Sequence, residues 1–132
     1  MHKYSFPAIF TEEENGLYSV HFPDIESCYT SGDNATHAIE MAEDVLAFVL
    51  CEYENQKKNI PEPSRVRDIK NLNDNEFVSL IACDTLEYRK QTENRSVKKT
   101  LTIPAWLNTI SERANVNYSA VLQEALIQRL GL

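Results

Sequence analysis

Three polar residues alternate along a short stretch near the C-terminus of this 132-residue chain: Lys98, Thr100 and Thr102. Successive side chains of a β-strand point to opposite faces, so these three side chains share one face. The apolar residues of the stretch share the other face: Val97, Leu101 and Ile103. A lysine amine and threonine hydroxyls can hydrogen-bond to base edges in the DNA major groove, which a two-stranded β-ribbon fits. The polar face is therefore a candidate DNA-reading surface.

Two helices are expected after this strand. Pro104 stops the strand and fits the first turn of a helix. The segment Asn115-Val116-Asn117 predicts a tight turn, after which Asn117 or Ser119 can cap a second helix. The free N–H groups at that helix start suit a phosphate. Asn117 and Ser119 are therefore added to the candidate DNA contacts.

One strand and two helices in residues 97–132 are too few to bury a core alone. The first helix is expected to bury Leu107, Ile110 and Ala114. The second helix has its own apolar set: Val121, Leu122, Ala125, Leu126 and Leu130. The economical solution is a homodimer in which two strands pair antiparallel and four helices cover their apolar side. The polar face of the ribbon then points outward.

Residues 97–130 resemble the ribbon-helix-helix DNA-binding family. The resemblance rests on the alternating strand, the Ile103-Pro104 stop and the polar turn before Tyr118-Ser119-Ala120-Val121-Leu122. Lys99 departs from the pattern, since an apolar residue would suit its position in the alternation. The alternative interpretation is a solvated helical hairpin that carries an incidental basic strand.

The upstream part of the chain predicts a domain of order βββαβ, which makes the protein α+β. Asn15-Gly16 is a strong hairpin signal between the first two strands. Asp33 is the expected N-cap of a long amphipathic helix that ends by Asn55–Lys58. The predicted strands are Tyr4–Thr11, Leu17–Phe22, Ser27–Ser31 and Glu76–Cys83, the last of them buried on much of both faces.

Charge divides the chain into two parts with different expected partners. Residues 1–87 carry 6 Lys/Arg against 17 Asp/Glu, whereas residues 88–132 carry 7 Lys/Arg against 3 Asp/Glu. We expect domains at 1–87 and 97–132, joined by a polar linker at 88–96. The acidic domain suits a basic partner, with candidate contacts at Glu12, Glu13, Glu14, Asp24 and the polar helix face, although ordinary solvation explains any single glutamate as well.

Several classes of protein and site are not expected. The three cysteines lie far apart and form no CxxC pair: Cys28, Cys51 and Cys83. His2, His21 and His37 lack the spacing of metal ligands. No apolar run approaches the ~18 residues of a membrane span, and the chain start lacks the apolar stretch of a signal peptide. The sequence predicts a cytoplasmic protein with no catalytic residue, metal, cofactor or membrane partner.

The N-terminal segments resemble the HicB family of antitoxins. The resemblance rests on Tyr4–Phe10, Asn15–Asp24, Cys28–Asp33 and Ile60–Ser64, and together with the C-terminal match it covers nearly the whole chain. It implies a reduced ribonuclease-H-like domain beside a DNA-binding module, binding and neutralisation of HicA, a small mRNA-cleaving toxin, and repression of the pair's own operon through operator DNA. Whether dimers pair into tetramers stays open.

Two alternatives to an antitoxin are considered. The first is a ribbon-helix-helix transcription regulator whose N-terminal domain senses a small ligand. The second is a residual nuclease, which would need clustered carboxylates to hold divalent metals. The segments Tyr4–Phe10 and Leu17–Phe22 contain no Asp or Glu, so the sequence argues against metal-dependent catalysis.

Overall fold

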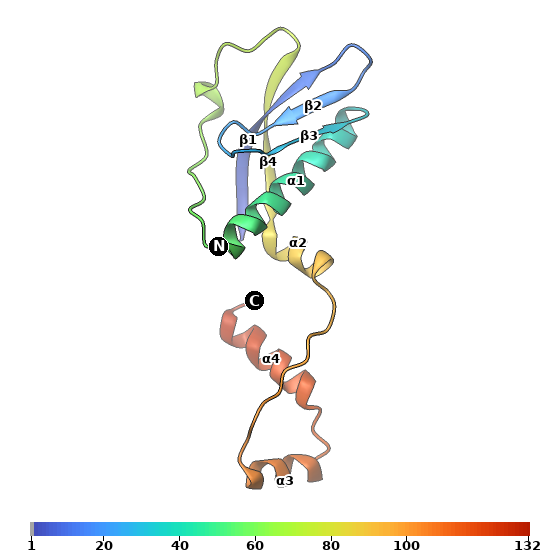
Figure 1. The fold of residues 1–132 in the computed structure, drawn as a ribbon, viewed down its shortest axis with the longest axis vertical. Coiled ribbons are helices and arrows are strands. Elements are labelled where there is room, and N and C mark those ends of the chain that lie inside the picture. The colour runs from blue at the N-terminus through green and yellow to red at the C-terminus, as the bar shows by residue number, and fades with distance from the viewer. Residues whose placement is uncertain (1) are drawn as a thin grey trace. The chain divides into compact units, whose positions relative to one another are not determined.

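The computed structural model describes residues 2–132, and the chain divides into two compact units with a boundary between Arg95 and Ser96 (Figure 1). The N-terminal unit holds all the strands of the described chain and its longest helix. The C-terminal unit holds two helices. None of the helices in residues 2–132 is long and apolar enough to cross a membrane.

The N-terminal unit has the expected order of three strands, a helix and a strand, followed by one further helix. Its sheet has the strand order β3-β2-β1-β4, and every neighbouring pair is antiparallel. The protein is therefore a mixed α+β fold with an N-terminal antiparallel sheet. The elements are β1 (Lys3–Glu12), β2 (Tyr18–His21), β3 (Tyr29–Gly32), α1 (Ala35–Asn55), the 3-10 turn η1 (Val66–Asp68), β4 (Glu76–Asp84) and α2 (Thr85–Thr92).

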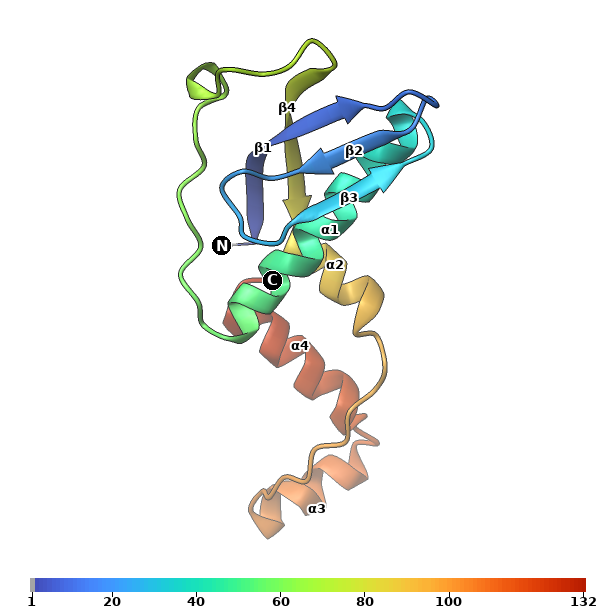
Figure 2. The same ribbon diagram turned by 45° about the horizontal axis from the view of Figure 1, so that its top comes forward.

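The core of this unit lies between the sheet and α1, which crosses one face of the sheet (Figure 2). Every second residue of β1 points into it, as the period of a strand requires. Every third or fourth residue of α1 meets them, as the period of a helix requires. The core cluster contains these side chains from the two elements: Phe6, Ala8, Phe10, Ala38, Ala42, Leu46 and Leu50.

Helix α1 begins one residue later than expected. Asn34, rather than Asp33, is its N-cap, and the Asn34 side chain accepts a hydrogen bond from the backbone N–H of His37 at 2.9 Å. Both residue types cap helices well, so composition could not decide between them. Just before this cap, β3 passes so close to the helix that a Cβ at Gly32 would overlap the backbone nitrogen of Ala38.

Strand β4 is less buried than predicted. Only Ile81 in this strand is fully buried, whereas Phe77 and Leu80 are 45% and 59% exposed. The reason is the strand order, which places β4 at the edge of the sheet where α1 covers only one face. Phe77 still stacks on Phe10, with ring centroids 5.2 Å apart. The prediction that both faces are buried was wrong.

Helix α2 occupies part of the expected linker. It runs through Thr92, and Asp84 caps it by accepting hydrogen bonds from the N–H groups of Leu86 and Glu87 at 2.9 and 3.2 Å. Residues 88–92, which were expected to belong to the linker, are therefore helical. The helix has few apolar residues, so no helical periodicity marks it in the sequence.

The C-terminal unit consists of α3 (Ala105–Arg113) and α4 (Tyr118–Leu130). Residues 97–104 form no strand within this chain. In the single chain Leu107 and Ile110 are 38% and 57% exposed, Ala114 is exposed and neither helix contains a buried residue, so their burial in a homodimer stays a prediction. Two helices of one chain enclose too little space to bury either apolar face.

Candidate functional site

The five candidate DNA contacts all lie at the surface of the C-terminal unit. Lys98, Thr100 and Thr102 are exposed in the segment before α3. Asn117 is the N-cap of α4, and its side-chain oxygen accepts a hydrogen bond from the Ala120 N–H at 3.1 Å. The predicted capping role of Asn117 is confirmed. Ser119 is exposed in the first turn of the same helix.

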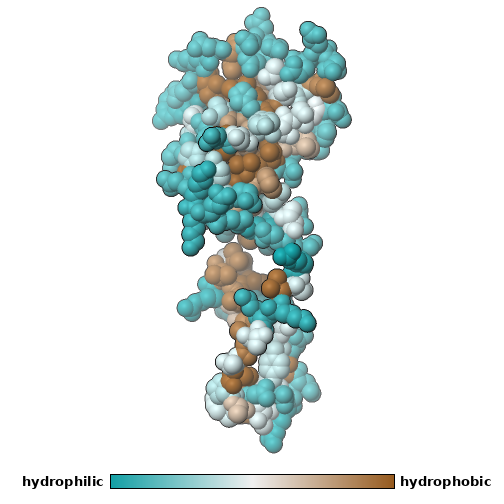
Figure 3. Space-filling model, in the orientation of Figure 1, coloured by the Kyte–Doolittle hydropathy of each residue, from teal (hydrophilic) through white to brown (hydrophobic). Residues whose placement is uncertain are grey.

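Large apolar side chains cover the surface of the C-terminal unit. Val97, Leu101 and Ile103 are 71%, 63% and 46% exposed, so the predicted apolar face of the strand is open to solvent. Figure 3 shows apolar side chains at the surface of this unit. Other exposed members of the set are Trp106, Leu107, Ile110, Val121, Leu126, Ile127 and Leu130. Exposed apolar area of this kind marks an interaction surface.

The acidic candidates lie in two separate places. Glu12, Glu13 and Glu14 lie at the turn before β2, where the Glu13 carboxylate accepts a hydrogen bond from the Ser19 hydroxyl at 2.9 Å. Asp24 follows β2 at its other end. Its carboxylate accepts hydrogen bonds from the backbone N–H and the hydroxyl of Ser64, at 2.8 and 2.5 Å. Asp24 therefore fastens the segment after α1 and is already engaged within the chain.

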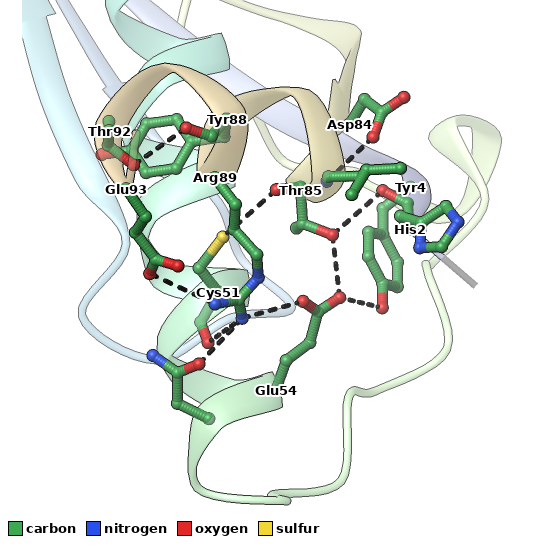
Figure 4. Close-up of polar contacts among 12 residues, drawn as sticks. His2, Tyr4, Cys51, Glu54, Asp84, Thr85, Tyr88, Arg89, Thr92 and Glu93 are labelled. Atoms are coloured by element: carbon green, nitrogen blue, oxygen red, sulfur yellow. Dashed lines mark hydrogen bonds and ion pairs between the residues drawn. The ribbon is translucent and has the colours of Figure 1, made fainter. Parts of the chain in front are cut away.

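A half-buried polar cluster joins both ends of the N-terminal unit, and no local sequence pattern indicates it (Figure 4). Glu54, near the end of α1, is its centre. The Glu54 carboxylate accepts hydrogen bonds from the Tyr4 hydroxyl at 2.8 Å, the Thr85 hydroxyl at 2.9 Å and the Arg89 guanidinium at 3.2 Å. Arg89 also donates to the side-chain oxygen of Asn55 at 2.8 Å. The cluster thus ties β1, α1 and α2 together.

The cluster shifts the protonation equilibria of its members. Burial opposes ionisation of Glu54, but the hydrogen bonds from Tyr4, Thr85 and Arg89 outweigh it and hold the pKa of Glu54 below its ordinary value. Burial, together with the hydrogen bond to Glu54, raises the pKa of Tyr4 to about 12. Glu54 is therefore a carboxylate and Tyr4 a neutral hydroxyl donor at neutral pH. The arrangement is that of a structural link between elements.

The cysteines have the environment of apolar core residues. Cys28 and Cys51 are buried and Cys83 is half-buried, and all three are free thiols. Burial raises the pKa of the Cys28 and Cys83 thiols to about 11 and about 12. A thiol with so high a pKa is a poor nucleophile at neutral pH. Within residues 2–132 no group of three or more His, Cys, Asp or Glu side chains is placed to hold a metal ion.

An open depression of about 550 Å³ lies where the start of β1 meets the end of β4. Tyr4, Glu43 and Cys83 are among the residues that line it. Small-molecule sites are usually enclosed and mostly apolar, with a few converging polar groups. This depression is open to solvent and does not favour the ligand-sensing alternative.

Comparison with known proteins identifies relatives of this chain. A curated relative, "Antitoxin HicB 2" of Photorhabdus laumondii, is 37% identical over 59 residues, which are 45% of this chain and 42% of that relative. The match therefore spans less than half the length of that relative. A solved toxin–antitoxin complex from Streptococcus pneumoniae contains a chain that is 26% identical, with a TM-score of 0.61 over 96% of this chain and 99% of that one.

Two further findings agree on the fold and the family. The crystal structure of the Burkholderia pseudomallei antitoxin HicB matches in fold, with 18% identity and a TM-score of 0.55 over 96% of this chain and 98% of that one. A family model described as the HicB_like antitoxin of bacterial toxin–antitoxin systems matches residues 5–81. Because that model covers more than half of the 132 residues, the protein belongs to the HicB-like antitoxin family.

Proposed function

We propose that this chain is an antitoxin that binds and neutralises a HicA-type mRNA-cleaving toxin and represses its own operon. The observation that carries the proposal is the similarity, over nearly the whole chain, to a chain of a solved toxin–antitoxin complex. In this proposal residues 1–87 bind the toxin and residues 97–132 bind operator DNA. The assignment of the first domain as reduced ribonuclease-H-like stays a prediction.

The charge of the N-terminal unit supports the toxin-binding role. Residues 1–87 have an excess of 11 acidic over basic residues. A toxin that cleaves mRNA must present a basic surface to its substrate, and an acidic protein surface competes for it. The chain then acts by binding and covering the toxin, without chemistry of its own.

Toxin binding is tested with the 132-residue chain and its HicA-type toxin partner. We expect the chain to co-purify with the toxin and to suppress RNA cleavage in proportion to the amount added. Binding should weaken as salt rises, because exposed charges are screened. RNA cleavage that continues at the same rate with excess chain present would refute the proposal.

The C-terminal unit supports DNA binding through a ribbon-helix-helix homodimer. Apolar residues are exposed on 97–103, α3 and α4. A second copy of the chain, related by two-fold symmetry, presents the same apolar surface and can bury these residues in a homodimer interface. Pairing of the two 97–104 segments would turn Val97, Leu101 and Ile103 inward. Lys98, Thr100 and Thr102 would then face the major groove, with Asn117 and Ser119 beside phosphates.

The test of DNA binding compares operator with random DNA at two salt concentrations. Changing Thr100 or Thr102 to Ala should weaken operator binding by about 1–3 kcal/mol for each base that the side chain no longer reaches, and leave the fold intact. Lys70→Ala removes an exposed lysine from the N-terminal unit and is the matched control. Unchanged operator affinity in the variant with Lys98, Thr100 and Thr102 all changed to Ala would remove this face from DNA recognition.

A further inference from the structure

Phe48 is an aromatic side chain on the outer side of α1, opposite the sheet. It is 52% exposed near the middle of a 21-residue helix. The α1 residues of the core cluster, Ala38, Ala42, Leu46 and Leu50, face the sheet, and α2 contacts the helix beside Cys51. Hot spots of protein–protein interfaces are rich in aromatic residues, so a half-exposed aromatic side chain on a helix is a candidate interface residue.

Carboxylates surround Phe48 along the same helix. Asp44 and Glu52 lie one turn before and one turn after it, and both are exposed. Residues four apart on a helix are neighbours, so the three side chains form a continuous stripe. Glu40 extends the acidic part of the stripe by another turn. We call these four residues the α1 stripe: Glu40, Asp44, Phe48 and Glu52.

The α1 stripe has no compensating charge in its own helix. Helix α1 contains five acidic residues and no Lys or Arg. Glu40 and Asp44 are like charges four residues apart, an arrangement that destabilises a helix. Among the described residues, no ion pair or side-chain hydrogen bond is made by Glu40, Asp44 or Glu52. A solvated helix face normally mixes both signs of charge, so this stripe suits a cationic partner.

The helix that carries the stripe is held rigidly. The fifth carboxylate of α1, Glu54, is engaged with Tyr4, Thr85 and Arg89, and Arg89 also reaches the Cys51 carbonyl at 3.2 Å (Figure 4). These contacts fasten the C-terminal end of α1 to β1 and α2. A surface that is ordered before binding loses less entropy on association.

We propose that the α1 stripe is the docking surface for the basic toxin, with Phe48 entering an apolar pocket of the partner while Asp44 and Glu52 pair with its Lys or Arg side chains. This inference rests on the proposed function and locates its toxin-binding surface. The alternative acidic surface is the turn at Glu12–Glu14. That turn has charge, but Leu17 beside it is a smaller side chain at 38% exposure, and the nearby Phe77 is occupied by stacking on Phe10 and by an edge contact with Tyr18.

The experiment measures, by calorimetry at low salt, the affinity of variants of the 132-residue chain for its HicA-type toxin partner. Two pairs of matched variants separate the two surfaces. The first pair compares Phe48→Ala with Leu17→Ala. The second pair compares two double variants: one combines Asp44→Lys and Glu52→Lys, and the other combines Glu13→Lys and Glu14→Lys. Each double variant changes the net charge by the same amount at exposed positions, so total charge is held constant between them.

We expect Phe48→Ala and the stripe charge reversal to weaken toxin binding at least tenfold, and the turn variants to change it less than threefold. Circular dichroism checks that each variant keeps its fold. Toxin binding by the stripe variants within threefold of the unchanged chain would overturn the inference while leaving the proposed function intact. Loss of oligomers in Phe48→Ala, with unchanged toxin affinity, would assign the stripe to self-association instead and also overturn it. Failure of the unchanged chain to bind the toxin would instead refute the proposed function.

Discussion

Glu54 offers the sharpest test of what holds the N-terminal unit together. The Glu54→Gln change keeps the length of the side chain but removes its charge. The native carboxylate accepts three hydrogen bonds, from Tyr4, Thr85 and Arg89. Glu54 and Arg89 are 24% and 26% exposed, so water replaces these contacts only in part.

The expected destabilisation follows from the number and type of contacts. A glutamine oxygen can still accept from one or two donors, but at least one donor is left unpaired and the ion pair with Arg89 is removed. Hydrogen bonds to a charged group contribute about 1.5–3 kcal/mol each, so we expect Glu54→Gln to lower the free energy of unfolding by about 2 kcal/mol. Glu52→Gln is the control, because Glu52 is exposed two residues away and should change stability by less than about 0.5 kcal/mol.

The assay is urea unfolding followed by far-UV circular dichroism, since the single tryptophan, Trp106, lies in the other unit. Acid provides a second arm. The pKa of folded Glu54 lies below the ordinary 4.5, so its contribution is present above that pH and is lost as the pH falls through the folded pKa. The stability difference between the unchanged chain and Glu54→Gln should therefore shrink below pH 4.5. Equal destabilisation in the Glu52 and Glu54 variants, or a difference that does not change with pH, would refute the reasoning.

Two further predictions concern the core. Gly32→Ala places a Cβ against the backbone nitrogen of Ala38, well inside van der Waals contact, and should destabilise the N-terminal unit by about 3 kcal/mol in urea unfolding. Gly16→Ala, where φ is +82° and no atom lies within 4 Å, should destabilise it by only about 1 kcal/mol, and equal effects at the two sites would contradict the close approach. Because burial raises the pKa of Cys28 and Cys83 to about 11 and about 12, both thiols should react slowly with iodoacetamide at pH 8 and rapidly in urea. Equal rates in both conditions would show that these thiols are open to solvent.

Local patterns in the sequence predicted the local features of the fold. Alternation and helical periodicity indicated the order βββαβ, and Asn15-Gly16 indicated the first turn, where Gly16 has a φ of +82°. Asn117 was correctly predicted as a possible helix cap. Each of these features depends on residues a few positions apart, so the signal and the structure that it predicts lie in the same short segment.

Features that depend on distant residues could not be predicted in this way. Glu54 and Arg89 are 35 positions apart, and neither residue has a local pattern that would mark it as more than surface charge. The exposure of Phe77 and Leu80 depends on the edge position of β4, which follows from strand order rather than from the composition of that strand.

The two units differ in whether a single chain can bury their apolar residues, and the proposed toxin-binding and DNA-binding activities should therefore respond differently to dilution. The N-terminal unit closes its own core within one chain. The C-terminal unit buries no residue of α3 or α4, so we expect its order to depend on association. On dilution, operator binding should therefore disappear at a higher chain concentration than toxin binding, and should fall with the square of the concentration of free chain. Titrating both activities over the same dilution series, with sedimentation equilibrium to follow the dimer, tests this order. Disappearance of both activities at one concentration would show that the N-terminal unit also depends on a second copy.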